Sequence, residues 1–75
     1  MAKASNQFVV CVKNDGFPAS LERRKIYVAL RYPPVEKRGQ LRVVDESGED
    51  YLYPKEFFRP IALPHSIKKA LLAAA

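Results

Sequence analysis

The chain alternates between short apolar runs and clusters of turn-forming residues. A continuous apolar run spans residues 8–12, and a run with a two-residue period spans 26–31. Both runs are too short for helices and predict strands, the first of them buried on both faces. The Asn-Asp-Gly sequence at 14–16 ends the first strand, because all three residues tolerate left-handed backbone angles. The two prolines at 33–34 end the second, because proline donates no hydrogen bond to a sheet.

The same pattern continues in the second half of the chain. Three further strands are predicted there, at 41–44, 51–53 and 57–61. An acidic loop at 45–49 joins the third strand to the fourth, and its Gly48 is placed to adopt a positive φ. A single turn at 54–57 precedes the fifth. Five short strands predict a mainly β fold that forms a small barrel, since 75 residues are too few for a two-sheet sandwich.

The end of the chain has a different period. Pro64 suits a first helical position, and one helical face carries Ile67, Ala70 or Leu71, and Ala74, away from the two lysines at 68–69. A helix of this length is marginal in water by itself. We therefore expect it to pack on the barrel, and the alternative is that it lies against a partner.

Two resemblances support a barrel. The segment YLYPKEFFRPI at 51–61 resembles the end of Src homology 3 domains, where a strand runs into a proline, one helical turn and a last strand. The connection at 14–24 is similar to the long folded-back loop of those domains, which carries binding specificity. A wider pattern resembles a group of small uncharacterised bacterial proteins with this barrel. It comprises Cys11, Asp15, Gly16, Phe17, Leu21, Lys25, Tyr27, Val44, Asp45, Gly48, Tyr53, Pro54 and Phe58.

The resemblance implies a five-stranded SH3-like β-barrel at 8–62. The residue patterns add a flexible N-terminus at 1–7 and a short C-terminal α-helix at 63–75, packed on the barrel. The resemblance implies little about activity, because one fold serves many functions. Relatives that bind polyproline peptides use a tryptophan and an acidic loop. This chain has no tryptophan and its loop carries Arg23, Arg24 and Lys25, so we do not expect it to bind such peptides.

Composition narrows the class of protein. Thirteen lysines and arginines against eight acidic residues give a net charge of +5, which favours loose attraction to phosphate. No apolar run approaches the ~20 residues of a membrane span. Residues 1–7 lack the apolar stretch of a secretory signal. Cys11 has no second cysteine to pair with. These features predict a cytoplasmic protein, a monomer or weak homodimer, without a membrane partner.

Candidate catalytic groups are few. Cys11 lies in an apolar strand, where a thiol behaves as a small hydrophobic group, and His65 begins the tail helix. No third group completes a triad with them, and one Cys and one His do not make a zinc site. The acidic residues at 45–50 do not have the spacing of a calcium loop. We therefore predict no enzyme, no metal and no cofactor.

The first hypothesis is a protein- or peptide-binding module. We interpret Leu52 as a side chain that fills the barrel, which leaves Tyr53 and Pro54 as an exposed shelf beside the long loop. Phe17 would extend this surface, since exposed aromatic residues often anchor interfaces. In this hypothesis, Arg23 and Arg24 of the long loop select an acidic partner.

The alternative is a nucleic-acid-binding accessory protein. Basic residues form three clusters, which are Arg23, Arg24 and Lys25; Lys37 and Arg38; and Lys68 and Lys69. Two clusters on one face would contact a phosphate backbone without reading the sequence. Bases would stack on Phe17, Tyr27, Tyr32 and Tyr51. The plainer interpretation is that the clusters are solvated and that most of the aromatic residues pack in the core.

Overall fold

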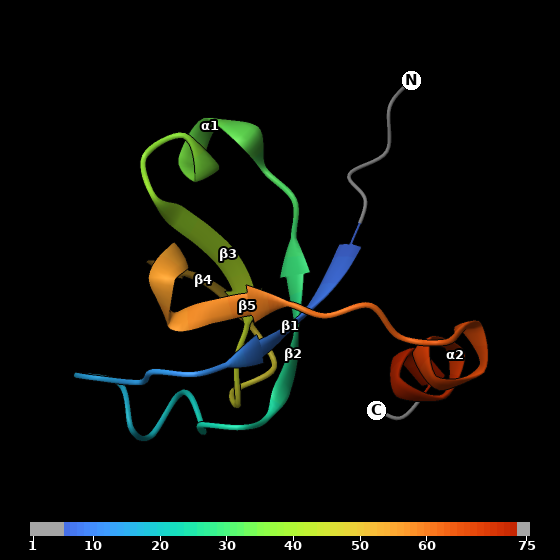
Figure 1. Ribbon diagram of the computed structural model, residues 1–75. Helices are drawn as coiled ribbons and strands as arrows, with labels where there is room; N and C mark the ends of the chain where they lie inside the picture. Colours follow the sequence, from blue (N-terminus) through green and yellow to red (C-terminus); the bar gives the residue numbers. More distant parts are fainter. Residues whose placement is uncertain (1–5, 74–75) are drawn as a thin grey trace.

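Five antiparallel strands form one sheet in the computed structural model, which describes residues 6–73 (Figure 1). The strands are β1 (Asn6–Cys11), β2 (Ile26–Leu30), β3 (Gln40–Val44), β4 (Asp50–Pro54) and β5 (Phe58–Pro60). Their order in the sheet is β4-β3-β2-β1-β5. The predicted mainly β fold of five strands and a C-terminal helix is confirmed. Within residues 6–73 no ladder joins β4 to β5, so the sheet is open and a closed barrel is not established.

Three helical segments accompany the sheet. They are α1 (Pro33–Glu36), the 3₁₀ turn η1 (Lys55–Phe57) and α2 (His65–Ala73). The turn between β4 and β5 lies where the sequence predicts it. The short α1 was not predicted, because its two prolines were interpreted only as the end of β2. Proline also suits the first turn of a helix, where its missing N–H would have no partner.

The N-terminal boundary differs from the prediction. β1 begins at Asn6 and pairs with β2 from Asn6 opposite Leu30 to Val10 opposite Ile26. Asn6 and Gln7, assigned to a flexible N-terminus from sequence, therefore belong to the sheet. Residues 1–5 lie outside the described part of the chain. On its other edge β1 pairs with β5, so the first strand lies between the second and the last.

One face of the sheet forms the core. Alternate residues of each strand point into it, as the two-residue period requires. The long connection between β1 and β2 adds Leu21, and η1 and β5 add two phenylalanines. The buried cluster is Val9, Cys11, Leu21, Tyr27, Ala29, Leu41, Val43, Tyr53, Phe57 and Phe58. The thiol predicted to be a small hydrophobic group, Cys11, is fully buried, and burial raises its pKa.

The interpretation of β4 from sequence was wrong. Tyr53 lies opposite Leu41 and is only 3% exposed, whereas Leu52 lies opposite Arg42 on the outer face and is 43% exposed. Because neighbouring residues of a strand point to opposite faces, only one of them can enter the core. Tyrosine can be the buried one when its hydroxyl finds a hydrogen-bond partner, and here Asp45 accepts that bond.

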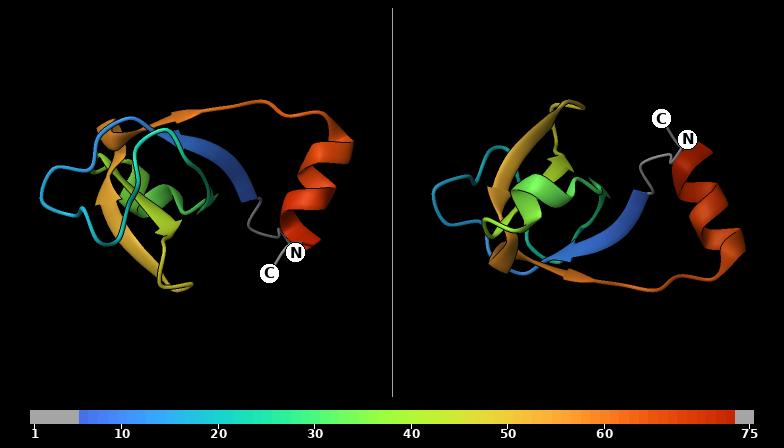
Figure 2. Two further views of the ribbon diagram at one scale, coloured as in Figure 1. Left: turned by 90° about the horizontal axis from the view of Figure 1, so that it is seen from below. Right: turned by 90° about the horizontal axis from the view of Figure 1, so that it is seen from above.

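The C-terminal helix also differs from the expectation. α2 lies beside the sheet, joined to β5 by residues 61–64, and both views of Figure 2 show it at the far end from the long connection. None of its residues is buried. Ile67, Leu71 and Leu72 are 45%, 40% and 59% exposed. The helix therefore forms as predicted, but the structure does not bury its apolar side chains against the sheet.

Candidate functional site

The long loop between β1 and β2, residues 12–25, folds back on itself. Its Leu21 is completely buried. The Asn14 side-chain amide donates to the Leu21 carbonyl at 3.0 Å, and the Phe17 N–H donates to the Asn14 carbonyl at 2.8 Å. The loop is also tied to the acidic turn, residues 45–49, by the Glu46 N–H, which donates to the Ser20 carbonyl at 3.0 Å. Its length is therefore used to cover one side of the core.

Phe17 is the aromatic residue at the bend of this loop. Its ring meets Tyr53 nearly edge-on, with 5.0 Å between the centroids and 89° between the planes, and its centroid lies 6.2 Å from that of Phe57. The side chain still has 39% of its surface exposed. Two core rings thus hold Phe17 in place and leave part of it free to contact another molecule.

An open hollow of about 400 Å³ lies between the long loop, the acidic turn and β4. Tyr51, which is 50% exposed, forms its outer wall. Leu52, which is 43% exposed, borders the hollow with its side chain on the opposite face of β4. We call this surface the aromatic depression. It is lined by Phe17, Ser20, Ser47, Tyr51, Leu52 and Tyr53. Three of these residues, Phe17, Tyr51 and Leu52, are large hydrophobic side chains that remain exposed.

Asp45 fixes the floor of the aromatic depression. It is 6% exposed and accepts hydrogen bonds from the Tyr53 hydroxyl at 2.5 Å, the Ser47 N–H at 2.9 Å and the Ser47 hydroxyl at 2.6 Å. Burial raises the pKa of Asp45, but the bonds from Ser47 and Tyr53 outweigh it and hold the pKa below its usual value. Asp45 is therefore a buried carboxylate that joins the acidic turn to β4.

A second network joins the long loop to the acidic turn. The Tyr27 hydroxyl donates to Glu46 Oε2 at 2.5 Å and accepts from the Glu22 N–H at 2.8 Å. Lys25 Nζ lies 2.6 Å from the same Oε2, and the pKa of Glu46 is lowered, first by this lysine and then by Tyr27. Tyr27 is only 5% exposed, so it cannot stack on a base. Lys25 already has a carboxylate partner.

The five predicted binding residues do not share one surface. Phe17 and Tyr53 meet in the aromatic depression, where Tyr53 is the floor and not an exposed shelf. Arg23 and Arg24 line a different hollow with three residues of 10–12, and Pro54 lines a third beside Gly39 and η1. Within residues 6–73 neither arginine forms an ion pair. Because Arg23 and Arg24 line this other hollow, they do not contribute to the aromatic depression.

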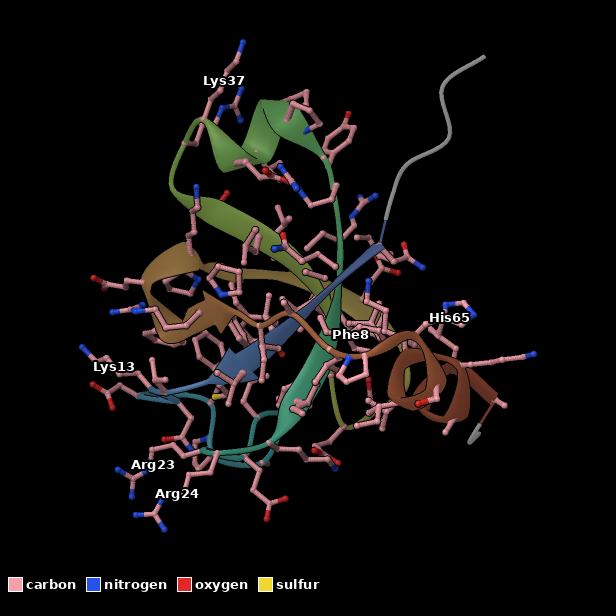
Figure 3. The ribbon with its side chains drawn as sticks, turned by 45° about the vertical axis from the view of Figure 1, so that its right-hand side comes forward. Phe8, Lys13, Arg23, Arg24, Lys37 and His65 are labelled. Carbon is pink, nitrogen blue, oxygen red and sulfur yellow. The ribbon has the colours of Figure 1, made fainter. Side chains whose placement is uncertain are left out.

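The basic clusters of the nucleic-acid alternative are separated in space. Figure 3 shows Arg23 and Arg24 at one end of the molecule, near Lys13, and Lys37 at the opposite end beside α1. Arg38 follows Lys37 directly, while Lys68 and Lys69 lie on α2. The three clusters thus lie in three different regions.

Arg24 has a strained backbone. Its φ is +73°, and its N–H donates to the Cys11 carbonyl at 2.7 Å. A left-handed conformation costs a residue with a side chain ~1–2 kcal/mol, whereas glycine's extra freedom when unfolded costs about 0.5–1 kcal/mol. We therefore expect Arg24→Gly to raise the free energy of unfolding by up to about 1 kcal/mol, as measured by urea denaturation. Arg24→Ala removes the same charge but keeps the Cβ. If it stabilised the protein equally, charge and not backbone strain would be the cause.

Sequence reasoning missed part of the depression. Ser20, Ser47 and the outward side of Leu52 carried no motif. The Asp-x-Ser pattern of the acidic turn was a usable signal, because aspartate commonly bonds to the backbone N–H two residues on, as Asp45 does with Ser47.

Among the residues described, no three His, Cys, Asp or Glu side chains group as metal ligands. Over the same residues, no helix has the length and apolar character needed to cross a membrane.

Comparison with known proteins gives no family for this chain. No family model, no curated protein and no solved structure matches it. The resemblance to Src homology 3 domains and to small bacterial proteins therefore stays a prediction from the residues quoted above, and any function must be argued from the surface of the molecule itself.

Proposed function

We propose that this protein is a non-enzymatic module that binds a peptide or protein segment in the aromatic depression. The observation that carries the proposal is the grouping of Phe17 and Tyr51, two aromatic side chains that are 39% and 50% exposed around one hollow, with the exposed Leu52 at its border. Exposed apolar side chains are common singly, but a contiguous group is typical of interaction sites. Aromatic residues are also the commonest energetic anchors of interfaces.

The walls of the depression are held in place before any partner arrives. Phe17 packs on Tyr53, Tyr53 is bonded to Asp45, and the Glu46 N–H holds the long loop through Ser20. A surface that is already ordered loses less conformational entropy on binding, which favours affinity. This rigidity supports a binding role for the depression.

Charge indicates the partner's chemistry. The acidic turn and β4 contribute four carboxylates, of which Glu46 and Asp50 are paired with Lys25 and Arg42. Asp45 and Glu49 have no ion-pair partner within residues 6–73. A segment with apolar side chains and a nearby Lys or Arg therefore fits this surface. The acidic partner expected from Arg23 and Arg24 would bind elsewhere.

Peptide selection tests the proposal without knowledge of the natural partner. We expect peptides selected from a random library against the full chain to contain apolar and basic residues, and to shift the NMR signals of Phe17, Tyr51 and Leu52. Tyr51→Ala should weaken their binding at least ~10-fold, as loss of an anchor does. The matched control is Tyr32→Ala, since Tyr32 is similarly exposed at 44% and does not line the depression.

Three outcomes would count against the module. Selected peptides that shift signals elsewhere, equal effects of the Tyr51 and Tyr32 variants, or no binding peptide at all would each overturn the assignment of the depression. Binding of a nucleic acid that falls steeply with salt, and is abolished by joint Arg23→Glu and Arg24→Glu substitution, would instead support the nucleic-acid alternative.

A further inference from the structure

The sheet formed within residues 6–73 has two edges, the strands β4 and β5. In an antiparallel pair, every second residue exchanges backbone hydrogen bonds with the neighbouring strand, and the residues between them turn their N–H and C=O groups the other way. At an edge these outward groups have no neighbour, so they can pair with another chain. The two edges of this sheet differ in how many such groups are left unbonded.

The β5 edge is blocked. The Phe57 carbonyl and the Ile61 N–H bond to β1 and its continuation, so the alternation turns Phe58 and Pro60 outwards. The Phe58 N–H already donates to the carbonyl of the first residue of η1, and the Phe58 carbonyl accepts a bond from Arg59 Nη1 at 2.9 Å. Proline has no N–H to offer. This edge therefore has no N–H left for a further strand.

The β4 edge is open. Glu49 and Lys55 flank this strand, and both bond to the chain of β3 across from them: the Glu49 carbonyl accepts an N–H at 3.0 Å, and the Lys55 N–H donates to a carbonyl at 2.8 Å. The alternation therefore turns Asp50, Leu52 and Pro54 outwards. Within residues 6–73, no strand pairs with β4 on this side. The N–H and C=O groups of Asp50 and Leu52 remain available, and Pro54 ends this open stretch.

The aromatic depression lies along the open edge. The side chains of Tyr51 and Leu52 point to opposite faces of β4, yet both residues line the same hollow. A hollow that reaches both residues has to pass the backbone between them. Phe17 and Ser20 border it from the long loop. The unbonded backbone groups of Leu52 therefore lie at the hollow.

We propose that the partner binds as an extended strand that adds to the β4 edge and bonds to the backbone of Asp50 and Leu52. This inference rests on the proposed function, because it names the conformation of the segment that the same site takes. In this mode of peptide recognition, backbone hydrogen bonds supply affinity and alternate side chains supply specificity. Because the long loop borders the same hollow, a single strand fits there more readily than the edge of a second folded sheet.

The surroundings of the edge define the side chains of the added strand. Tyr51 and Glu49 lie on one face, two positions apart, and the Tyr51 hydroxyl donates to Glu49 Oε1 at 3.1 Å. Within residues 6–73 Glu49 has no ion-pair partner. An apolar side chain against Phe17 and Tyr51, with a Lys or Arg two positions away facing Glu49, matches this face. Proline is excluded where the strand must donate to β4.

A backbone scan of the bound peptide tests the added strand. The probes are peptides selected from a random library against the full chain, with each residue in turn replaced by its N-methyl form. Methylation removes one N–H and keeps the side chain. We expect it to weaken binding ~10-fold or more at alternate residues and to have little effect at the residues between them, because only every second N–H of an added strand faces β4.

Hydrogen exchange of the protein locates the strand. In the free protein the amides of Asp50 and Leu52 should exchange rapidly, whereas those of Tyr51 and Tyr53 should exchange slowly because they bond to β3. A bound peptide should slow exchange at Asp50 and Leu52 by ~10-fold or more, as hydrogen bonding of these amides requires.

A substitution on the edge itself gives a third test. Leu52→Pro removes one outward N–H without removing a bond to β3, so it should weaken peptide binding ~10-fold. The matched control is Leu52→Ala, which shortens the side chain, keeps the N–H and should weaken binding less. Circular dichroism checks that both variants fold, and the backbone scan decides the question if Leu52→Pro does not.

Four outcomes separate this inference from the proposed function. Methylation that is tolerated at every residue, or rapid exchange of Asp50 and Leu52 with peptide bound at Phe17, would refute the added strand alone. Slow exchange of the two amides in the dilute free protein would show that the edge is already covered. Slowing that grows with protein concentration alone would make a second copy the occupant. Failure to select any binding peptide would refute the proposed function as well.

Discussion

Replacing Leu21 by alanine is expected to lower the free energy of unfolding by about 3 kcal/mol, within the ~2–5 kcal/mol range of buried leucines. Leu21 belongs to the long loop, yet no part of it is exposed, and it packs in the core cluster with Tyr27 and Tyr53. The substitution removes apolar contacts and leaves a cavity that the surrounding strands cannot close. A domain this small has little stability to lose.

Thermal and urea unfolding measure this effect, and the midpoint of thermal unfolding should fall by at least about 10 °C. The control is Leu52→Ala, the same truncation at a leucine that is 43% exposed. Its effect should stay within about 0.5 kcal/mol. Equal losses at the two positions would mean that the long loop is not part of the core, which would contradict the packing described above.

Replacing Asp45 by alanine is expected to cost about 2–4 kcal/mol. The carboxylate accepts three hydrogen bonds, from Tyr53 and from the N–H and hydroxyl of Ser47. Its loss leaves the Tyr53 hydroxyl without this acceptor at a residue that is 3% exposed. Asp45→Asn keeps the shape and one acceptor oxygen, so its cost should be smaller. Urea denaturation at pH 7 measures the free energy of unfolding of both variants and shows which of them loses more. Equal stability of Asp45→Ala and the natural sequence would contradict the role given to Asp45.

The same group makes stability depend on pH. The pKa of Asp45 is lower in the folded protein than its usual value of ~3.9, so the unfolded chain binds protons more readily. Its contribution to stability is therefore complete above about pH 4 and is lost as the pH falls through the folded-state pKa. Glu46 has a pKa shifted in the same direction. We expect Asp45→Asn to lose stability less steeply on acidification than the natural sequence. Parallel pH profiles would exclude this linkage.

Much of the fold was readable from local patterns. The five strands, the positive φ of Gly48 and the turn before β5 follow from the two-residue period and from glycine and proline chemistry. The helix at the end followed from its period as well. What local patterns did not predict is which face of β4 enters the core, because Tyr51, Leu52 and Tyr53 are all apolar enough to be buried. The hydroxyl of Tyr53 decides this through Asp45, eight residues away.

The candidate site was less predictable, for a related reason. Phe17 was identified because an exposed aromatic residue of the long loop can anchor an interface, and it does line the aromatic depression. Arg23 and Arg24 were grouped with it because they share the long loop. The loop folds back at Leu21, so residues only a few positions apart in sequence line separate hollows. The separation of Lys37 from Arg23 likewise depends on the sheet topology and not on spacing along the chain.

The position of β1 has a consequence for synthesis on the ribosome. β1 leaves the ribosome before every other strand, yet it forms ladders with both β2 and β5, and β5 is made last of the five. Two core phenylalanines, Phe57 and Phe58, come with this late segment. A nascent chain that ends before β5 therefore exposes one edge of β1 and lacks part of its core. Such an edge is a template for pairing with other chains, so the nascent chain is open to this pairing until β5 has emerged.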